Sequence, residues 1–220
     1  MTKQKIGFTL AEVLITLGII GIVAALTIPT LMQQQKKIAT QSAIKKFYSN
    51  WSNAIKLSEA ENGPSDKWNK EEFDAEDEDV ANAKVRNAEA FFNQYMAPYL
   101  KYTSKETRDE NGIPRFIVTL ADGTEMMMSN GACMDYRIDV NGIKGPNEYG
   151  KDRFHFVHCI NHPWGNTNYC YPSGKVSYCP YYASKTREQL LDLCEENGIY
   201  CAALLEKDNW EFKDDYPYKF

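Results

Sequence analysis

The feature that most constrains this chain is a long apolar run near its N-terminus. From Phe8 to Met32 the sequence holds one ionisable residue, Glu12. A run of this length is enough for a helix to cross a bilayer, since about 20 apolar residues are required. Two lysines precede the run and no other lysine or arginine occurs before Lys36, which favours a cytoplasmic N-terminus and an exported main domain. We therefore expect a single-pass membrane helix over residues 8–32.

Glu12 is an unusual residue in such a helix, because an ionisable side chain in hydrocarbon is costly unless a partner neutralises it. Cleavage after Gly7 would create an α-amino group on Phe8, about one helical turn from Glu12 of the same chain and accessible to Glu12 of a neighbour. A cut at this position would supply the missing partner. Two alternatives stay open: a plain membrane anchor, and a secretory signal cut near Ala24 and Ala25 that releases a soluble domain.

This segment is similar to a known family motif. Type IV prepilins and type II secretion pseudopilins carry a leader and cleavage motif that the residues from Lys5 to Glu12, KIGFTLAE, resemble. The resemblance implies that a prepilin peptidase cuts between Gly7 and Phe8, that Phe8 becomes N-methylated, and that Glu12 registers incoming subunits. It implies a structural subunit of a type IV pilus-like fibre or of a type II secretion pseudopilus, and it leaves the choice between them open.

The same resemblance implies partners and a location. The partners are other pilin or pseudopilin subunits in a homo- or hetero-polymer, the prepilin peptidase, the assembly platform of the inner membrane, and the membrane itself. The chain is expected first in the inner (cytoplasmic) membrane with its head outward, and then in a periplasmic or cell-surface fibre. A single-pass membrane-anchored extracytoplasmic binding protein, whose helix never leaves the membrane, stays open as the alternative function.

Beyond the membrane helix, apolar residues continue at steps of three and four. This pattern predicts one long helix from about Phe8 to Glu61 that ends at Asn62-Gly63-Pro64. Its apolar stripe contains Ile38, Ile44, Phe47, Tyr48, Trp51, Ile55 and Ser58. The expected domains are a prepilin leader at 1–7, a transmembrane and polymerisation helix at 8–32, an amphipathic continuation of the helix at 33–62, and a globular head at 63–220.

The head is predicted to combine a helix with a sheet. A second amphipathic helix is expected from about Val80 to Leu100, and alternating apolar residues predict a small antiparallel sheet of about four strands. The strands are expected around Phe116–Leu120, Glu125–Ser129, Met134–Val140 and Phe154–Ile160. The fold class is therefore α+β, with a long N-terminal helix packed on a small antiparallel sheet and a cysteine-rich, loop-rich C-terminal region.

Six cysteines lie between residues 133 and 201. Their even number and their clustering in a loop-rich region favour disulfides and an oxidising compartment. Cys194 and Cys201 flank a short turn and could close a small loop, while six cysteines permit 15 connectivities among which the sequence cannot choose. Reduced thiols, or metal ligation by some of these cysteines, stay open as the alternative.

A loop between the last two predicted strands is a candidate calcium site. Residues Asp139–Phe154 resemble the glycine-punctuated loop of the major pseudopilin head, which binds calcium in that family. Asp139, Asn141 and Asp152 offer the hard oxygen ligands that calcium prefers. Calcium is the one cofactor that the resemblance implies. A turn-rich connector, in which Asp and Asn side chains cap their own backbone, is an equally open interpretation.

Composition and motifs argue against an enzyme and against nucleic acid as a main partner. The formal net charge is -5, and no cluster of Lys and Arg interleaves with aromatic residues as a nucleic-acid groove requires. The sequence contains no phosphate-binding glycine loop, nucleophile elbow or dinucleotide fingerprint. His155 and His158 are three residues apart in a predicted strand, so they point to opposite faces and do not predict a shared zinc site.

Overall fold

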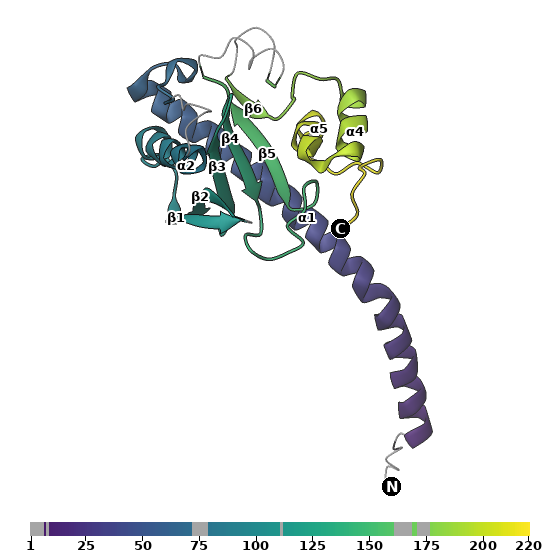
Figure 1. Cartoon of the computed structure of the whole chain (residues 1–220). Helices are drawn as coiled ribbons and strands as arrows, with labels where there is room; N and C mark the ends of the chain where they lie inside the picture. Colours follow the sequence, from purple (N-terminus) through teal and green to yellow (C-terminus); the bar gives the residue numbers. More distant parts are fainter. Residues whose placement is uncertain (1–6, 8, 72–78, 111, 161–168, 171–176) are drawn as a thin grey trace. The chain divides into compact units, whose positions relative to one another are not determined.

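Figure 1 shows the computed structural model of the chain, which describes residues 7, 9–71, 79–110, 112–160, 169–170 and 177–220. The chain divides into two compact units, residues 1–39 with Phe220 and residues 40–219. We call the first the N-terminal unit and the second the head unit.

Helix α1, Leu10–Asn62, begins in the N-terminal unit and ends in the head unit. Among the described residues it is the one helix that is long and apolar enough to cross a membrane. The helix stops at Gly63, which has a φ of 76° and whose N–H donates to the Glu59 carbonyl at 3.0 Å. Glycine adopts this left-handed conformation without strain, which makes it the usual residue after a helix. The long helix and its predicted end are confirmed.

Within the head unit, one face of α1 is buried. The buried residues of α1 are Ile44, Phe47, Trp51, Ala54, Ile55 and Ser58. Trp51 is completely buried and its ring lies 5.0 Å from the Tyr136 ring and 5.6 Å from the Phe156 ring, centroid to centroid. The predicted apolar stripe therefore forms the helical side of the core, except that Ile38, which the pattern included, is 49% exposed.

The head unit contains a six-stranded antiparallel sheet in which the strands are neighbours in sequence order. The strands are β1 Tyr102–Glu110, β2 Ile113–Leu120, β3 Glu125–Asn130, β4 Met134–Asp139, β5 Arg153–His158 and β6 Tyr178–Pro180. The prediction of about four strands was therefore wrong in number. Strand β1 is an edge strand with polar and mostly exposed residues, so it shows no apolar alternation, and β6 has only 3 residues.

Helix α2, Val80–Phe91, packs on β2 and β3 and continues as one turn of π-helix, η2, Phe92–Met96. The predicted second helix is thus present, although it ends before Leu100. Short 3₁₀ helices lie at η1, Ser65–Lys67, and η3, Gly198–Tyr200. Two further helices, α4 Arg187–Glu196 and α5 Cys201–Lys207, follow the sheet, and α5 packs on β5 and β6.

Three disulfides staple the later part of the head unit. They join Cys133 to Cys159, Cys170 to Cys179, and Cys194 to Cys201. The first connects the start of β4 to the end of β5, and the third connects α4 to α5 across the short turn noted in the sequence. Every cysteine of the chain is paired, as is typical of exported proteins.

Candidate functional site: the N-terminal helix and the β4–β5 loop

Glu12 forms a capping box with Thr9 at the start of α1. The Thr9 backbone N–H and hydroxyl donate to Glu12 Oε2 at 2.8 and 2.7 Å. The Glu12 backbone N–H donates in return to Thr9 Oγ1 at 3.3 Å. These reciprocal bonds satisfy donors that the first turn of a helix otherwise leaves free. The Thr-x-x-Glu spacing of this box is visible in the sequence, but our sequence analysis did not use it.

Of the two predicted processing residues, the structure describes Gly7. Gly7 is exposed, and Phe8 lies outside the described residues. Glu12 is exposed as well, and within the described part of the chain it makes no ion pair. An α-amino group created at Phe8 by cleavage would therefore meet a Glu12 carboxylate that accepts hydrogen bonds from Thr9 but makes no ion pair with a described residue.

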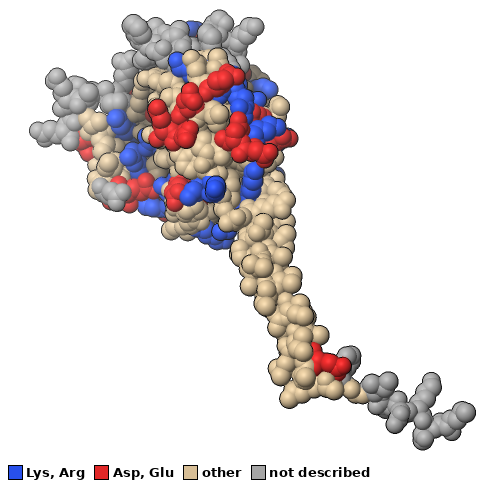
Figure 2. Space-filling view, turned by 90° about the vertical axis from the view of Figure 1, so that its right-hand side faces the viewer, with Lys and Arg blue, Asp and Glu red and all other residues tan. Residues whose placement is uncertain are grey.

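The N-terminal unit exposes a continuous apolar surface. Figure 2 shows charged groups gathered on the head unit, whereas the N-terminal unit is largely uncharged. Its large exposed apolar residues are Leu10, Val13, Leu14, Ile15, Leu17, Ile19, Ile20, Ile22, Val23, Leu26, Ile28, Leu31, Met32 and Ile38. Isolated in water, such a surface would be unstable, so it must be covered by lipid or by other apolar helices.

Polar and small residues of this helix suit an apolar environment. The hydroxyls of Thr16 and Thr27 donate to the carbonyls of Glu12 and Val23, each at 2.9 Å, so neither needs water. A Cβ at Gly18 or Gly21 would meet no atom within 4 Å. Both glycines therefore leave open surface on which a second helix can approach closely.

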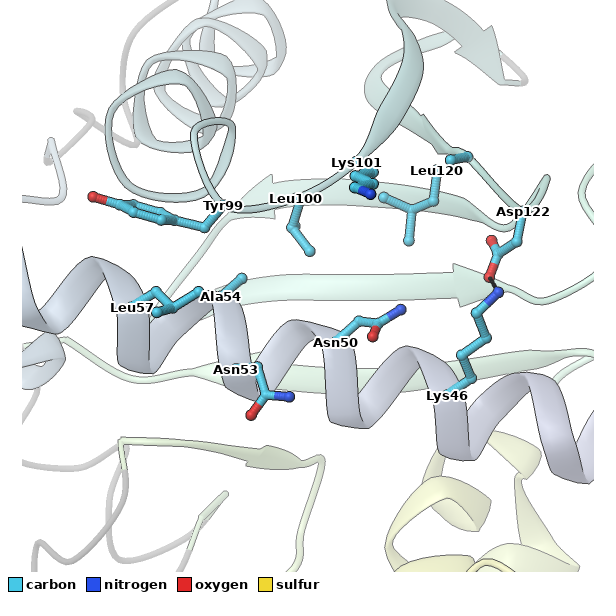
Figure 3. Close-up of a pocket in the computed structure, with 11 residues that line it drawn as sticks. Lys46, Asn50, Asn53, Ala54, Leu57, Tyr99, Leu100, Lys101, Leu120 and Asp122 are labelled. Carbon is cyan, nitrogen blue, oxygen red and sulfur yellow. Dashed lines mark ion pairs between the residues drawn. The ribbon is translucent and has the colours of Figure 1, made fainter.

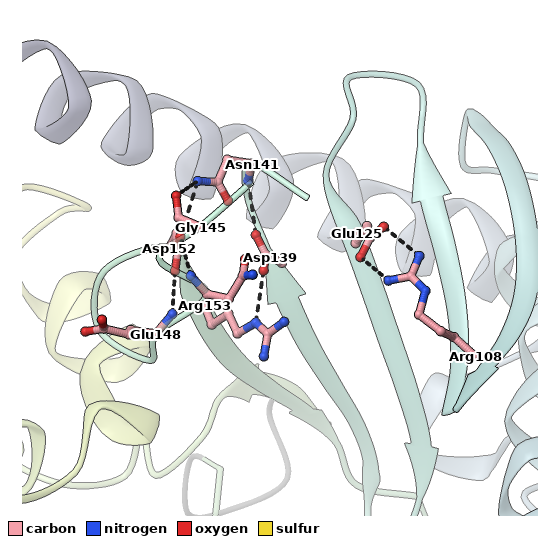
Figure 4. A network of polar contacts seen from close by, with 9 residues as sticks. Arg108, Glu125, Asp139, Asn141, Gly145, Glu148, Asp152 and Arg153 are labelled. Atoms are coloured by element: carbon pink, nitrogen blue, oxygen red, sulfur yellow. Dashed lines mark hydrogen bonds and ion pairs between the residues drawn. The ribbon is translucent and has the colours of Figure 1, made fainter. Parts of the chain in front are cut away.

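The β4–β5 loop brings together the three residues predicted to bind calcium (Figure 4). Asp152 is buried and accepts hydrogen bonds from the backbone N–H groups of Glu148 at 2.7 Å and Asn147 at 2.9 Å. Asn141 Nδ2 donates to the same carboxylate at 3.2 Å. Asp152 therefore caps backbone N–H groups of its own loop, as expected for the turn-rich connector that was the alternative to a calcium site.

Asp139 is the other buried carboxylate of the loop. Arg153 Nε donates to its Oδ2 at 2.9 Å. Burial raises the pKa of Asp139 to about 6, against the opposing effect of Arg153. Burial also acts to lower the pKa of Arg153, but the hydrogen bond to Asp139 outweighs it and the pKa is raised. The guanidinium thus stays charged, and Asp139 is the partner that titrates.

Asn147 is a loop residue that our sequence analysis did not select. It has a φ of 56°. With its amide nitrogen turned inward it donates to Asp139 Oδ2 at 3.0 Å and to the carbonyls of Gly142 and Lys144 at 3.2 and 3.3 Å. One carboxylate oxygen and two carbonyl oxygens, all of the hard type, therefore surround the Asn147 side-chain amide. Rotation of this amide would bring its own oxygen into the same set. A calcium ion fits this donor chemistry if it displaces the amide nitrogen.

The site has few carboxylates for a metal centre. Among the described residues, no group of three or more His, Cys, Asp and Glu side chains could hold a metal ion. A cation in this loop would depend on backbone carbonyls and Asn oxygens as much as on Asp139. Calcium accepts such ligands, whereas zinc prefers nitrogen and sulfur.

Two family models match adjacent parts of the chain. Residues 2–28 match the family model of the prokaryotic N-terminal methylation motif. Residues 30–220 match the model of a family of unknown function, DUF6613. The chain is a type IV pilin-like member of the DUF6613 family. No curated protein and no solved structure matches it.

The two histidines of β5 lie on opposite faces of the DUF6613 sheet, as their spacing predicts. His155 Nε2 lies 2.9 Å from Asp135 Oδ1, and His158 Nε2 lies 3.0 Å from the Ser65 carbonyl oxygen. Burial lowers the pKa of His158 to about 4, so this imidazole is neutral at physiological pH. The pair therefore does not form a shared zinc site.

A groove of about 430 Å³ on the DUF6613 head lies between α1, the segment just before β1, and the end of β2 (Figure 3). Lys46 and Asp122 point toward each other at one end and form an ion pair of 2.9 Å. Its lining is Lys46, Asn50, Asn53, Ala54, Leu57, Tyr99, Leu100, Lys101, Leu120, Ala121 and Asp122. This set contains no serine, cysteine or histidine.

Proposed function

We propose that the chain is a structural subunit of a type IV pilus-like fibre or a type II secretion pseudopilus. A prepilin peptidase removes residues 1–7, Phe8 is N-methylated, and the subunit then assembles through α1. One observation carries this proposal. The exposed apolar surface of α1 begins at Leu10, three residues after Gly7, and carries Glu12 as its one ionisable group before Lys36.

The physical argument concerns two successive environments. The apolar surface of α1 is covered first by lipid and then by the same helix of other subunits, so transfer between them costs little hydrophobic free energy. Glu12 makes the transfer specific. The new α-amino group of Phe8 neutralises a carboxylate that lies at a fixed distance along the helix, so subunits dock in one register.

The proposal includes the location and the partners. The chain spans the inner membrane once with its head outward, meets the assembly platform there, and joins other pilin or pseudopilin subunits in the fibre. Two lysines on the N-terminal side and the three disulfides of the head support this orientation. The role is structural and involves no catalysis.

Photo-crosslinking distinguishes this function from a single-pass anchored binding protein. A photoreactive residue at Leu14, which is 61% exposed on α1, should crosslink to a second pilin-like subunit when the assembly machinery is present. The matched control is the same photoreactive residue at Leu14 in cells that lack the assembly platform, where crosslinks to subunits should disappear. Crosslinks to lipid alone in both strains would support the anchored binding protein.

We also propose that the β4–β5 loop binds calcium when its amide and carbonyl groups rearrange around the ion. Convergence of Asp139 Oδ2 with the Gly142 and Lys144 carbonyls supports this assignment. Calcium would offset the unfavourable burial of a charged Asp139.

Calcium is expected to raise the melting temperature of the full chain in detergent at pH 7.5 and to have a smaller effect at pH 5. Asp139 has a folded pKa above its ordinary value, so its contribution to stability is fully present at low pH and is lost as the pH rises through about 6. Calcium, which binds the charged form, restores that loss only above this pH. Thermal unfolding with and without a chelator measures the effect.

Asp139→Asn is the test variant, and Asp109→Asn, at an exposed position near the end of β1, is the control. The calcium shift should vanish in the first and persist in the second. If a chelator leaves the melting temperature of the wild-type chain unchanged, the loop does not bind calcium and is a turn-rich connector.

A further inference from the structure

The ion-pairing of the six arginines points to a second site. Four of them pair with carboxylates: Arg86 with Asp79 at 3.2 Å, Arg108 with Glu125 at 2.9 Å, Arg153 with Asp139 at 2.9 Å, and Arg187 with Asp208 at 2.6 Å. Within the described part of the chain, Arg115 and Arg137 make no ion pair. In a protein with more acidic than basic residues, two arginines without a carboxylate partner require an explanation.

Arg115 and Arg137 face the same cavity. Arg115 lies on β2 and Arg137 on β4, so β3 is the one strand between them. Both line a groove of about 470 Å³ that also includes the start of α2. The polar groups of this arginine groove are Lys84, Arg115, Ser129, Asn130, Asp135 and Arg137.

The guanidinium groups are partly buried without being satisfied. The Nε atoms of Arg115 and Arg137 are both inaccessible to solvent and lack a hydrogen-bond partner in the described structure. A buried donor of a charged group that makes no hydrogen bond costs stability. Two such donors line one groove, and the described residues supply neither with a partner.

Electrostatics around the arginine groove favour an anion. Arg115 and Arg137 line it with one described carboxylate, Asp135, whose Oδ1 lies 2.9 Å from His155 Nε2. Arg115 also stands directly opposite Arg108 across β1 and β2, and like charges in this position destabilise a sheet. Arg108 forms ion pairs with Glu106 and with Glu125, the second of which Figure 4 shows, whereas Arg115 makes no ion pair with a described residue.

Arg137 also borders a smaller cavity, of about 190 Å³, on its other side. The carboxylates there include Glu125 and Asp139, which are bonded to Arg108 and Arg153, and Glu110. Two of these three carboxylates are therefore already hydrogen-bonded to an arginine other than Arg137. Among the described residues, none of these three carboxylates forms an ion pair with Arg137.

We propose that the arginine groove binds a ligand through a carboxylate or phosphate group. Guanidinium groups recognise both by paired N–H···O bonds, with Ser129 and Asn130 as further polar contacts. The site is separate from α1 and does not require polymerisation. It would give the head a recognition function in addition to its place in a fibre.

Titration calorimetry on the full chain in a zwitterionic detergent tests the proposal, with orthophosphate and citrate as separate probes at low salt. We expect saturable binding of at least one probe, and the responding probe identifies phosphate or carboxylate as the preferred group. Arg115→Gln or Arg137→Gln should weaken binding at least ten-fold, because each removes charge-assisted hydrogen bonds. Arg86→Gln, an exposed arginine on α2, should change affinity less than two-fold.

A second measurement separates binding from a structural role. Without ligand, both groove variants should melt at or above the wild-type temperature, because each removes an unsatisfied positive charge. In the wild-type chain, phenylglyoxal should modify Arg115 and Arg137 faster than Arg187, and the bound probe should protect them. No saturable binding of either probe, equal weakening by Arg86→Gln, or no protection of the two arginines would overturn the proposal.

Discussion

Glu12→Ala is expected to reduce incorporation of the chain into fibres at least ten-fold while the head unit stays folded. At the centre of a membrane helix an acidic side chain costs about 2.5–3.5 kcal/mol unless a partner neutralises it, and Glu12, in the first turn of α1, is expected to cost less. Docking onto the amine of a processed subunit recovers much of this free energy. A recovery of about 1.4 kcal/mol already changes the equilibrium constant for incorporation ten-fold. Quantitative blotting of sheared fibres against membrane-bound protein measures the ratio.

The capping box makes a sharper design available. Glu12→Ala removes both the charge and the acceptor for the Thr9 N–H, so loss of assembly could reflect a frayed helix start. Glu12→Gln keeps an acceptor oxygen at the same position and removes the charge alone. Thr9→Ala keeps the charge and weakens the cap, at a typical cost of about 1 kcal/mol.

The charge account predicts that both Glu12 variants fail to assemble and that Thr9→Ala assembles. Normal fibres from Glu12→Gln would show instead that the acceptor, and not the charge, is what assembly requires. Membrane levels of every variant serve as the control for insertion and stability.

Trp51→Ala is expected to destabilise the head unit by about 3–5 kcal/mol. Trp51 is fully buried and its ring contacts Phe47, Tyr136, Phe156 and Tyr178. Truncation leaves a cavity between α1 and the sheet, because the disulfides and strand pairing limit collapse around it. Denaturant unfolding followed by circular dichroism, with the full chain in detergent, measures the difference.

Leu57→Ala is the matched control for this substitution. Leu57 lies on the same helix and is 57% exposed, so its truncation should cost less than about 1 kcal/mol. Similar losses for the two variants would mean that α1 does not pack on the sheet as described.

Those parts of the fold that bury apolar surface with a regular period could be predicted from the sequence. The α1 stripe from Ile44 to Ser58 and the alternation in β2 to β5 are of this kind. Strand β1 could not be found, because its neighbour β2 and not a buried face determines its conformation. An edge strand of polar residues carries no periodic signal.

The candidate sites show a similar division. Glu12 could be selected because an isolated charge in an apolar run needs an explanation, and its neighbourhood matched a motif. Asn147 and the pair Arg115 and Arg137 could not, because their roles depend on which strands and loops become neighbours. A lone arginine in a strand is ordinary, whereas two unpaired guanidinium groups in one groove are visible only in the folded chain.

The central claim is prepilin processing, and the mature N-terminus tests it most directly. Intact-mass and peptide mass spectrometry should be applied to the protein recovered from membranes and from sheared cell surfaces. The account predicts a chain that begins at N-methylated Phe8 in both fractions. A chain that begins at Met1 would contradict it and indicate a plain anchor, and a start near Leu26 would indicate a secreted domain.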